Sequence, residues 1–192
     1  MASKESYETQ DVKGNIMTTR ILGIDPSLVK SGFGLLEVTD GQIESWQSWT
    51  FPTNTKATIE DRVTAIFLQV KQAIVNRDVH IVAMESGFVR GDHGQTSLKL
   101  GYVRAACMIA ARSMEKSFFQ YTPQQAKQAA TSYGGASKDQ VRDAMTMILK
   151  ADTRLPSDEA DALAVAFCHW NRMDETALIS ASLNAGRSEV GG

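Results

Sequence analysis

The stretch "PSDEADALAVAFCHW", residues 156–170, sets two aspartates in front of a long apolar run. Pro156 suits the start of a helix, where its missing N–H is not needed. Asp158 and Asp161 then stand three residues apart in the first turn, so both project from one helix face. The helix dipole favours acids there by about 0.3–1 kcal/mol, which accounts for Asp158. Asp161 borders the apolar stripe that should pack on the core, so it needs another explanation.

Outward from this helix, apolar spacing predicts an α/β domain with a mixed five-stranded sheet flanked by helices. Three consecutive β-type runs suggest an antiparallel meander, and "VHIVAME" is apolar enough to be a strand buried on both faces. The expected strands are 20–25, 31–38, 41–51, 79–85 and 116–122, and the expected helices are 58–76, 96–114, 137–150 and one from 156. The predicted order is βββαβαβαα. We expect residues 18–175 to form one domain, between an N-terminal extension (1–17) and a loose C-terminal tail (176–192).

The composition is that of a globular protein, with 192 residues, 43% of them hydrophobic and 22% charged. Cys107 and Cys168 lie in apolar helical surroundings, which predicts buried thiols in a reducing compartment rather than a disulfide. Apolar runs fall short of a membrane span, and residues 1–20 lack the pattern of a targeting segment. We therefore expect a cytoplasmic protein without a membrane partner.

The formal net charge of −2 hides an uneven distribution along the chain. Residues 86–142 carry eight Lys or Arg against three acids, whereas the segments 21–85 and 143–192 are both acidic. A basic middle segment suits a nucleic-acid partner, but ordinary solvated helix faces would produce the same pattern. Charge alone does not decide between these interpretations.

Two further acids stand at the ends of predicted strands. Asp25 ends the first strand and Glu85 the fourth, and the order of elements favours these strands as neighbours, so that their carboxylates converge at one sheet edge. A buried carboxylate without a partner is costly, and Mg²⁺ prefers oxygen ligands. Two such ions roughly 4 Å apart would clamp the attacking and leaving oxygens of a phosphodiester displacement. The pattern therefore predicts a metal site that also includes Asp158 and Asp161.

Five blocks of the sequence resemble the RuvC family of Holliday-junction resolvases in order and spacing, over about residues 18–170. They are "GIDPSLVKSGFGLLE" (23–37), "VAMESGF" (82–88), "SLKLGYVRAAC" (97–107), "YTPQQAKQAATSYGGASKDQV" (121–141) and "DEADALAVAFCH" (158–169). The resemblance implies an RNase H-like fold and a homodimer that uses Mg²⁺ or Mn²⁺. It also implies paired nicks in opposite strands of a four-way DNA junction, with 5′-phosphate products, and a branch-migration helicase as a possible partner.

The resemblance also suggests roles for individual residues. The metal-binding catalytic acids are expected to be Asp25, Glu85, Asp158 and Asp161, with two ions per active site. Lys127 and Lys138 match lysines that serve catalysis or DNA contact. Phe88 matches an aromatic that packs against unpaired bases, although alone an aromatic after a buried strand is more often core. Arg90, in the same polar loop, is a further expected DNA contact.

Other features lie beside these motifs. Ser27 stands where many members of the family have glycine, which affects the turn after Asp25 but not the acids. The helix predicted from Thr96 contains "RAACMIAA", whose small residues suit close packing. We expect one end of this helix to form a dimer interface and the other to pack in the core. His169 is expected to border the core rather than bind metal, and Trp46 and Trp49 to serve packing.

Three other functions fit parts of the sequence. A sugar-kinase or actin-like ATPase also begins with an acid-containing hairpin, but it needs two such domains and 192 residues are too few. A related metal nuclease with broader branched-DNA or flap activity fits the same acids. A non-cleaving junction-binding module would not need all four acids, which favours cleavage.

Overall fold

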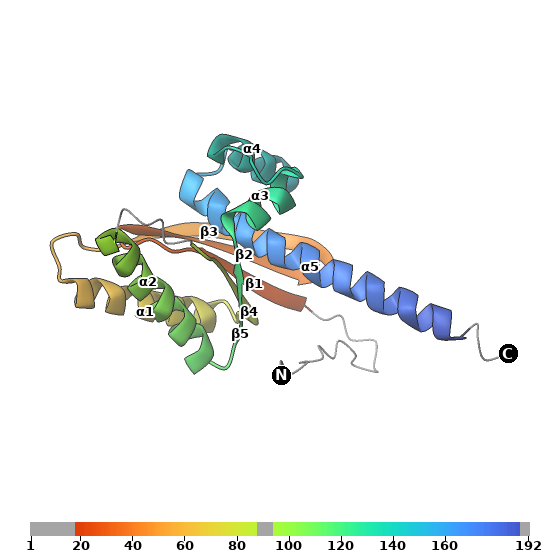
Figure 1. Ribbon diagram of the computed structural model, residues 1–192, viewed down its shortest axis with the longest axis horizontal. Coiled ribbons are helices and arrows are strands. Elements are labelled where there is room, and N and C mark those ends of the chain that lie inside the picture. Colours follow the sequence, from red (N-terminus) through yellow and green to blue (C-terminus); the bar gives the residue numbers. More distant parts are fainter. Residues whose placement is uncertain (1–17, 88–93, 189–192) are drawn as a thin grey trace.

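The computed structural model describes residues 18–87 and 94–188, with side chains as far as residue 173. Within these two ranges, five strands and five helices follow one another (Figure 1). They are β1 (Thr18–Asp25), β2 (Lys30–Thr39), β3 (Gln42–Pro52), α1 (Ile59–Asn76), β4 (Ile81–Glu85), α2 (Gly94–Ser113), β5 (Ser117–Tyr121), α3 (Pro123–Thr131), α4 (Lys138–Ile148) and α5 (Ser157–Ser188).

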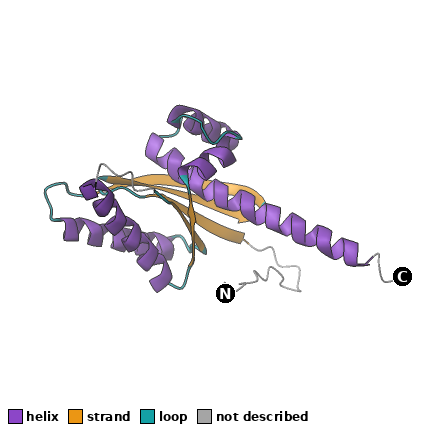
Figure 2. Cartoon of the chain, viewed as in Figure 1, coloured by secondary structure: helices purple, strands orange, loops and turns teal. Residues whose placement is uncertain are grey.

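The five strands form one mixed sheet, drawn in orange in Figure 2. Their order in the sheet is β3-β2-β1-β4-β5. The first three are an antiparallel meander, whereas β4 runs parallel to both β1 and β5. The predicted sheet is therefore confirmed, as is the expectation that β1 and β4 lie side by side. Their parallel register pairs Ile24 with Met84, so the next residue of each strand is an acid at the same sheet edge.

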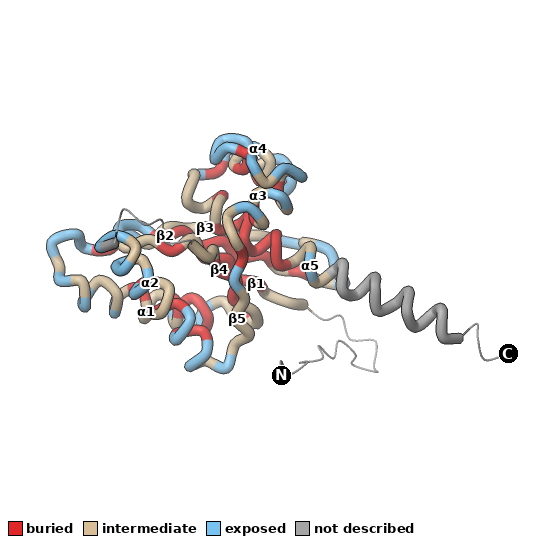
Figure 3. Tube along the Cα trace, in the orientation of Figure 1, coloured by how far each residue is buried: buried red, intermediate tan, exposed pale blue. Residues whose placement is uncertain are grey.

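Helices cover both faces of the sheet (Figure 1). Successive strand residues point to opposite faces, and the buried residues divide accordingly. Leu22, Ile24 and Met84 pack toward α1 and α2, whereas Ile21 and Ala83 pack toward α5 and α3. Figure 3 shows buried residues concentrated in the strands and in the part of α5 that crosses the sheet. Asp25 and Glu85 share the alternation of Ile21 and Ala83, which directs them to the α5 face.

Glycines in β1 and β2 allow the backbone of α5 to lie directly on the sheet. A Cβ on Gly32 would lie 2.7 Å from the carbonyl carbon of Asp158 and closer still to its oxygen. A Cβ on Gly34 would lie 2.6 Å from the backbone nitrogen of Leu163. Carbon atoms normally approach no closer than about 3.5 Å. The glycines therefore fix how close the first turns of α5 come to the ends of the strands.

The predicted order of elements misses one helix, α3. Thr122 caps this helix, its hydroxyl accepting from the Gln125 N–H while the Gln125 side chain accepts from the Thr122 N–H, and Pro123 takes the first position. This reciprocal capping box, with Pro at the start, is a known sequence signal for a helix beginning. The capping box is visible in the sequence as "TPQQ" (122–125). The segment that follows is short and ends in glycines, so its spacing does not predict a helix. The observed order is βββαβαβααα.

Two further expectations concern α5 and α2. The backbone of α5 continues to Ser188, beyond the domain end expected at residue 175, and the looseness of the C-terminal tail stays a prediction. In α2 the buried residues begin at Val103, and apolar residues on the opposite face of this part stay exposed; the dimer interface expected at the other end of the helix stays a prediction. Val103 and Cys107 are buried, whereas Leu98 and Ile109 are more than half exposed. The 3.6-residue repeat separates these sets around the helix.

The smaller predictions about packing hold. Both cysteines are buried as free thiols. Trp46 donates to the Leu149 carbonyl oxygen at 2.9 Å, and Trp49 stacks on Phe33. Within the part of the chain that the structure describes, no helix is both long and apolar enough to cross a lipid bilayer.

Candidate active site at the ends of β1, β4 and α5

The four predicted acids come together on the α5 side of the sheet edge. Asp25 and Glu85 are the last residues of β1 and β4, and Asp158 and Asp161 occupy the first turn of α5. Asp25 experiences the negative charge of all three others. We call these four residues the acidic site.

The electrostatics of the acidic site reflect burial and mutual repulsion. Burial raises the pKa of Asp25 to about 7, with repulsion from Glu85 and Asp161 adding to the effect and Lys138 opposing it. Burial and the charge of Asp161 also raise the pKa of Glu85, whereas Lys138, Arg104 and Lys127 lower it. Like-charged carboxylates in a partly dry environment resist ionising together. The acidic site therefore carries more negative charge than its lysines and arginine neutralise, and a bound cation would reduce the repulsion.

Two lysines engage the aspartates of α5. Lys138, at the start of α4, places Nζ 2.7 Å from Asp161 Oδ2, and Lys30, at the start of β2, places Nζ 2.8 Å from Asp158 Oδ2. The pairing with Asp161 raises the pKa of Lys138, so this lysine stays charged. The lysines reach the acidic site from different elements on either side of α5.

The donor atoms suit a hard divalent cation, because all four side chains offer carboxylate oxygens. Within the described ranges, no three metal-ligating side chains stand close enough to hold an ion as they are, and two of the acids are instead paired with lysines. The residue types and their repulsion thus fit a hard divalent cation, and each lysine contacts only one oxygen, Oδ2, of its aspartate.

Comparison with known proteins identifies the family. The family model "Crossover junction endodeoxyribonuclease RuvC" matches residues 21–169. The chain belongs to the RuvC family. RuvC of Ralstonia nicotianae is 37% identical over 150 residues, which cover 78% of this chain and 82% of that protein. RuvC of Magnetococcus marinus is 33% identical over 153 residues, which cover 80% of this chain and 84% of that protein.

Solved RuvC structures share the fold. Thermus thermophilus RuvC in complex with a Holliday junction substrate superposes with a TM-score of 0.73 at 28% identity, covering 81% of this chain and 96% of that chain. The structure of T. thermophilus RuvC determined separately gives a TM-score of 0.70. The RNase H-like fold predicted for this RuvC chain is therefore confirmed.

The expected DNA-binding residues divide into two groups. Lys127 on α3 and Lys138 on α4 both lie close enough to Glu85 to lower its pKa, so the fold brings them to the acidic site. Phe88 and Arg90 lie outside the described residues, and their roles stay predictions.

Two cations of this RuvC chain were not anticipated at the site. Lys30 lies in a turn that hydrogen bonds between Ser27 and Ser31 close. The Ser31 hydroxyl donates to the Ser27 carbonyl oxygen at 2.7 Å and accepts from the Ser27 N–H at 3.1 Å. No sequence pattern predicts that this turn aims Lys30 at Asp158. Arg104 lies within the electrostatic reach of Glu85 and Asp25. Its signal in the sequence is a single cation among the small and apolar residues of "GYVRAACMIAA".

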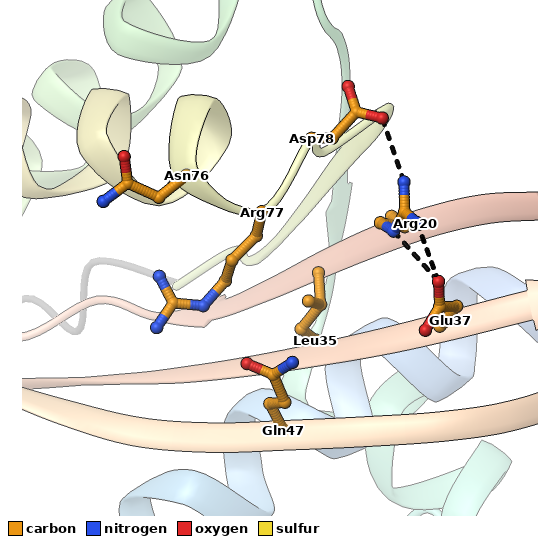
Figure 4. Close-up of a pocket in the computed structure, with 7 residues that line it drawn as sticks. All are labelled: Arg20, Leu35, Glu37, Gln47, Asn76, Arg77 and Asp78. Atoms are coloured by element: carbon orange, nitrogen blue, oxygen red, sulfur yellow. Dashed lines mark hydrogen bonds and ion pairs between the residues drawn. The ribbon is translucent and has the colours of Figure 1, made fainter.

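A hollow in the protein surface lies away from the acidic site. It has a volume of about 670 Å³ and is lined by Arg20, Leu35, Glu37, Gln47, Asn76, Arg77 and Asp78 (Figure 4). Arg20 bridges Glu37 and Asp78 there, at 2.9 Å from each. The hollow borders the beginning of β1, whereas Asp25 ends that strand, and none of the four acids lines it.

Proposed function

We propose that this chain resolves four-way DNA junctions by hydrolysing one phosphodiester in each of two opposite strands, leaving 5′-phosphate ends. The observation that carries the proposal is the convergence of Asp25, Glu85, Asp158 and Asp161 from two strands and a helix. Membership of the RuvC family supports the reaction, and T. thermophilus RuvC has been solved with a Holliday junction substrate.

The four acids are proposed to hold Mg²⁺, with Mn²⁺ as a substitute and two ions per active site. Divalent ions at such a site stabilise charge on the attacking and leaving oxygens of an in-line displacement. Asp25 and Glu85 offer partly buried carboxylates whose repulsion favours a bound cation. Asp158 and Asp161 complete the donor set from the more exposed side, where the DNA strand would enter.

Lys138 and Lys127 are proposed to act on the phosphate. If a cation bound the Asp161 carboxylate, the ammonium of Lys138, which lies 2.7 Å from Asp161 Oδ2, would be available to a phosphate oxygen. A cation held in position there stabilises negative charge that develops during hydrolysis. Lys127, on the neighbouring helix α3, would contact the same strand.

Phe88 and Arg90, which follow β4 in the sequence, are proposed to contact the DNA at the centre of the junction. Stacking of an unpaired base on an aromatic ring contributes about 1–3 kcal/mol and tolerates different sequences. This property suits an enzyme that selects the shape of a junction.

A homodimer is proposed because paired cuts need two active sites related by two-fold symmetry. The apolar residues Leu98, Tyr102 and Ile109 lie on one face of α2, opposite the face that packs in the core, and are 56%, 46% and 54% exposed. A helix that is apolar on both faces usually covers one face with a partner. A branch-migration helicase in the bacterial or phage-infected cytoplasm is a further partner expected from the family.

The proposal is tested with purified protein and four labelled DNA substrates: a mobile four-way junction, a flap, a Y-fork and a linear duplex, each with and without Mg²⁺. Symmetric Mg²⁺-dependent nicks confined to the junction are expected. Comparable cutting of the flap or the Y-fork would instead identify a broader branched-DNA nuclease. Tight junction binding without cutting would identify a binding module.

A further inference from the structure

Arg104 lies near the middle of α2, with its guanidinium packed against Gly87, two residues beyond Glu85. A Cβ on Gly87 would lie 2.5 Å from Nη1 of Arg104 and closer still to Cζ and Nη2. Ser86, between Glu85 and Gly87, is anchored by its N–H to the Tyr121 carbonyl oxygen at 2.7 Å. The absence of a side chain at position 87 therefore provides the space that the guanidinium occupies, beside a fixed segment of backbone.

The guanidinium lies within the electrostatic reach of Glu85 and Asp25 without forming an ion pair with either of them. Glu85 and Asp25 both favour its charged form, while burial opposes it and lowers the pKa of Arg104. Among the residues that the structure describes, no carboxylate oxygen lies within 4.0 Å of its nitrogens, and its buried Nε has no hydrogen-bond partner. Lys30 and Lys138, in contrast, contact their aspartates at 2.8 and 2.7 Å. Arg104 thus has unused donors beside the acids.

These unused donors suit a phosphodiester. A buried donor without an acceptor is unfavourable, and an arriving acceptor removes that cost. The planar guanidinium offers parallel N–H groups that match two phosphate oxygens.

The position of α2 adds a geometric argument. α2 covers one face of the sheet, whereas α3 lies on the other, beside α5 (Figure 1). Arg104 therefore approaches the ends of β1 and β4 from the face opposite to Lys127. A DNA strand that crosses this sheet edge would meet cations on both sides.

We propose that Arg104 binds a backbone phosphate of the DNA strand on the α2 side of the acidic site, and that Gly87 is required to leave room for its guanidinium. This inference rests on the proposed function, since it assumes that DNA enters the acidic site. Arg104 is a DNA-binding residue in this account, distinct from the lysines that pair with the acids.

The test is a double-mutant cycle of junction binding, measured by fluorescence anisotropy in EDTA over a range of salt concentrations. Arg104→Ala should weaken binding about tenfold or more and lower the slope of log K against log salt by about 0.9 for each phosphate that the protein no longer neutralises. Gly87→Ala, which keeps the charge but displaces it, should weaken binding in the same direction. The double variant should bind like Arg104→Ala alone, because the three atoms nearest to the added methyl group all belong to the Arg104 guanidinium.

Matched variants separate this role from a general loss of charge or of folding. Arg112→Gln removes an exposed arginine from the last turn of the same helix and should leave the salt slope nearly unchanged. Arg104→Lys keeps the charge without the planar fork and should recover only part of the affinity. Thermal unfolding of each variant checks that its fold is retained.

The inference is overturned if Arg104→Ala binds the junction with wild-type affinity and salt slope. It is also overturned if Gly87→Ala binds the junction with wild-type affinity. The same holds if the fold-loss of affinity in the double variant equals the product of the two single losses. Failure of the proposed function is distinguishable, because wild-type protein would then cut no branched DNA in Mg²⁺, whatever the variants bind.

Discussion

Replacing Gly32 with alanine should separate the four carboxylates of the acidic site without altering any of them. The new Cβ would lie 2.7 Å from the Asp158 carbonyl carbon, whereas such atoms normally stay about 3.5–4.0 Å apart. The first turn of α5 must therefore move by roughly 1 Å, carrying Asp158 and Asp161 away from Asp25 and Glu85. A misplacement of about 1 Å can reduce a reaction rate by about 10²-fold. Overpacking should also lower the free energy of unfolding by about 1–3 kcal/mol.

The assay is single-turnover cleavage of a four-way junction in Mg²⁺, with thermal unfolding of the same samples. Gly32→Ala should cut about 10²-fold more slowly and unfold at a lower temperature, by roughly 2–4 °C for each kcal/mol. Gly101→Ala is the matched control for stability, because a Cβ there would meet nothing within 4 Å and alanine favours helix. A Gly32→Ala variant that is destabilised as expected but cuts at the wild-type rate would refute the link between the position of α5 and catalysis.

Three other predictions address the acids, the dimer and acid stability. Asp25→Asn or Asp161→Asn should leave junction binding largely intact in gel-shift assays while abolishing Mg²⁺-dependent nicking, and wild-type-like cutting by either variant would refute the assigned roles. Ile109→Glu should place charge on the exposed face of α2 and produce monomers in light scattering; an unchanged dimer would locate the interface elsewhere. Burial lowers the pKa of His169 to about 4, so wild-type protein should lose stability as the pH falls from about 6.5 to 4, because the unfolded chain binds the proton more readily. His169→Gln should flatten this part of the Tm profile, and parallel profiles would contradict the assignment.

Most of the fold follows from local patterns in the sequence. The apolar runs of β1, β2 and β4 predict the central sheet, and the change from period 2 to period 3.6 locates the helices around it. The helix α3 escapes this prediction although its capping box stands in the sequence at Thr122 and Gln125. The end of α5 is not predicted, because the Ala-rich and polar residues after the core stripe do not distinguish a projecting helix from a loose tail.

The acidic site is predictable because its acids stand at the ends of elements. Asp25 and Glu85 end neighbouring parallel strands, so their convergence follows from topology once β1 and β4 are paired. Lys30 and Arg104 are not predictable, because their placement depends on a turn and on the packing of α2 against the segment after β4. Spacing along the chain carries no information about the position of either side chain.

The central claim, that these four carboxylates bind the divalent ions used for cleavage, is tested most directly by anomalous diffraction from crystals soaked in Mn²⁺. The account predicts anomalous peaks between Asp25, Glu85, Asp158 and Asp161, with the Lys30 and Lys138 ammonium groups displaced from their aspartates. Fully occupied Mn²⁺ elsewhere on the protein, with none between these four side chains, would contradict it.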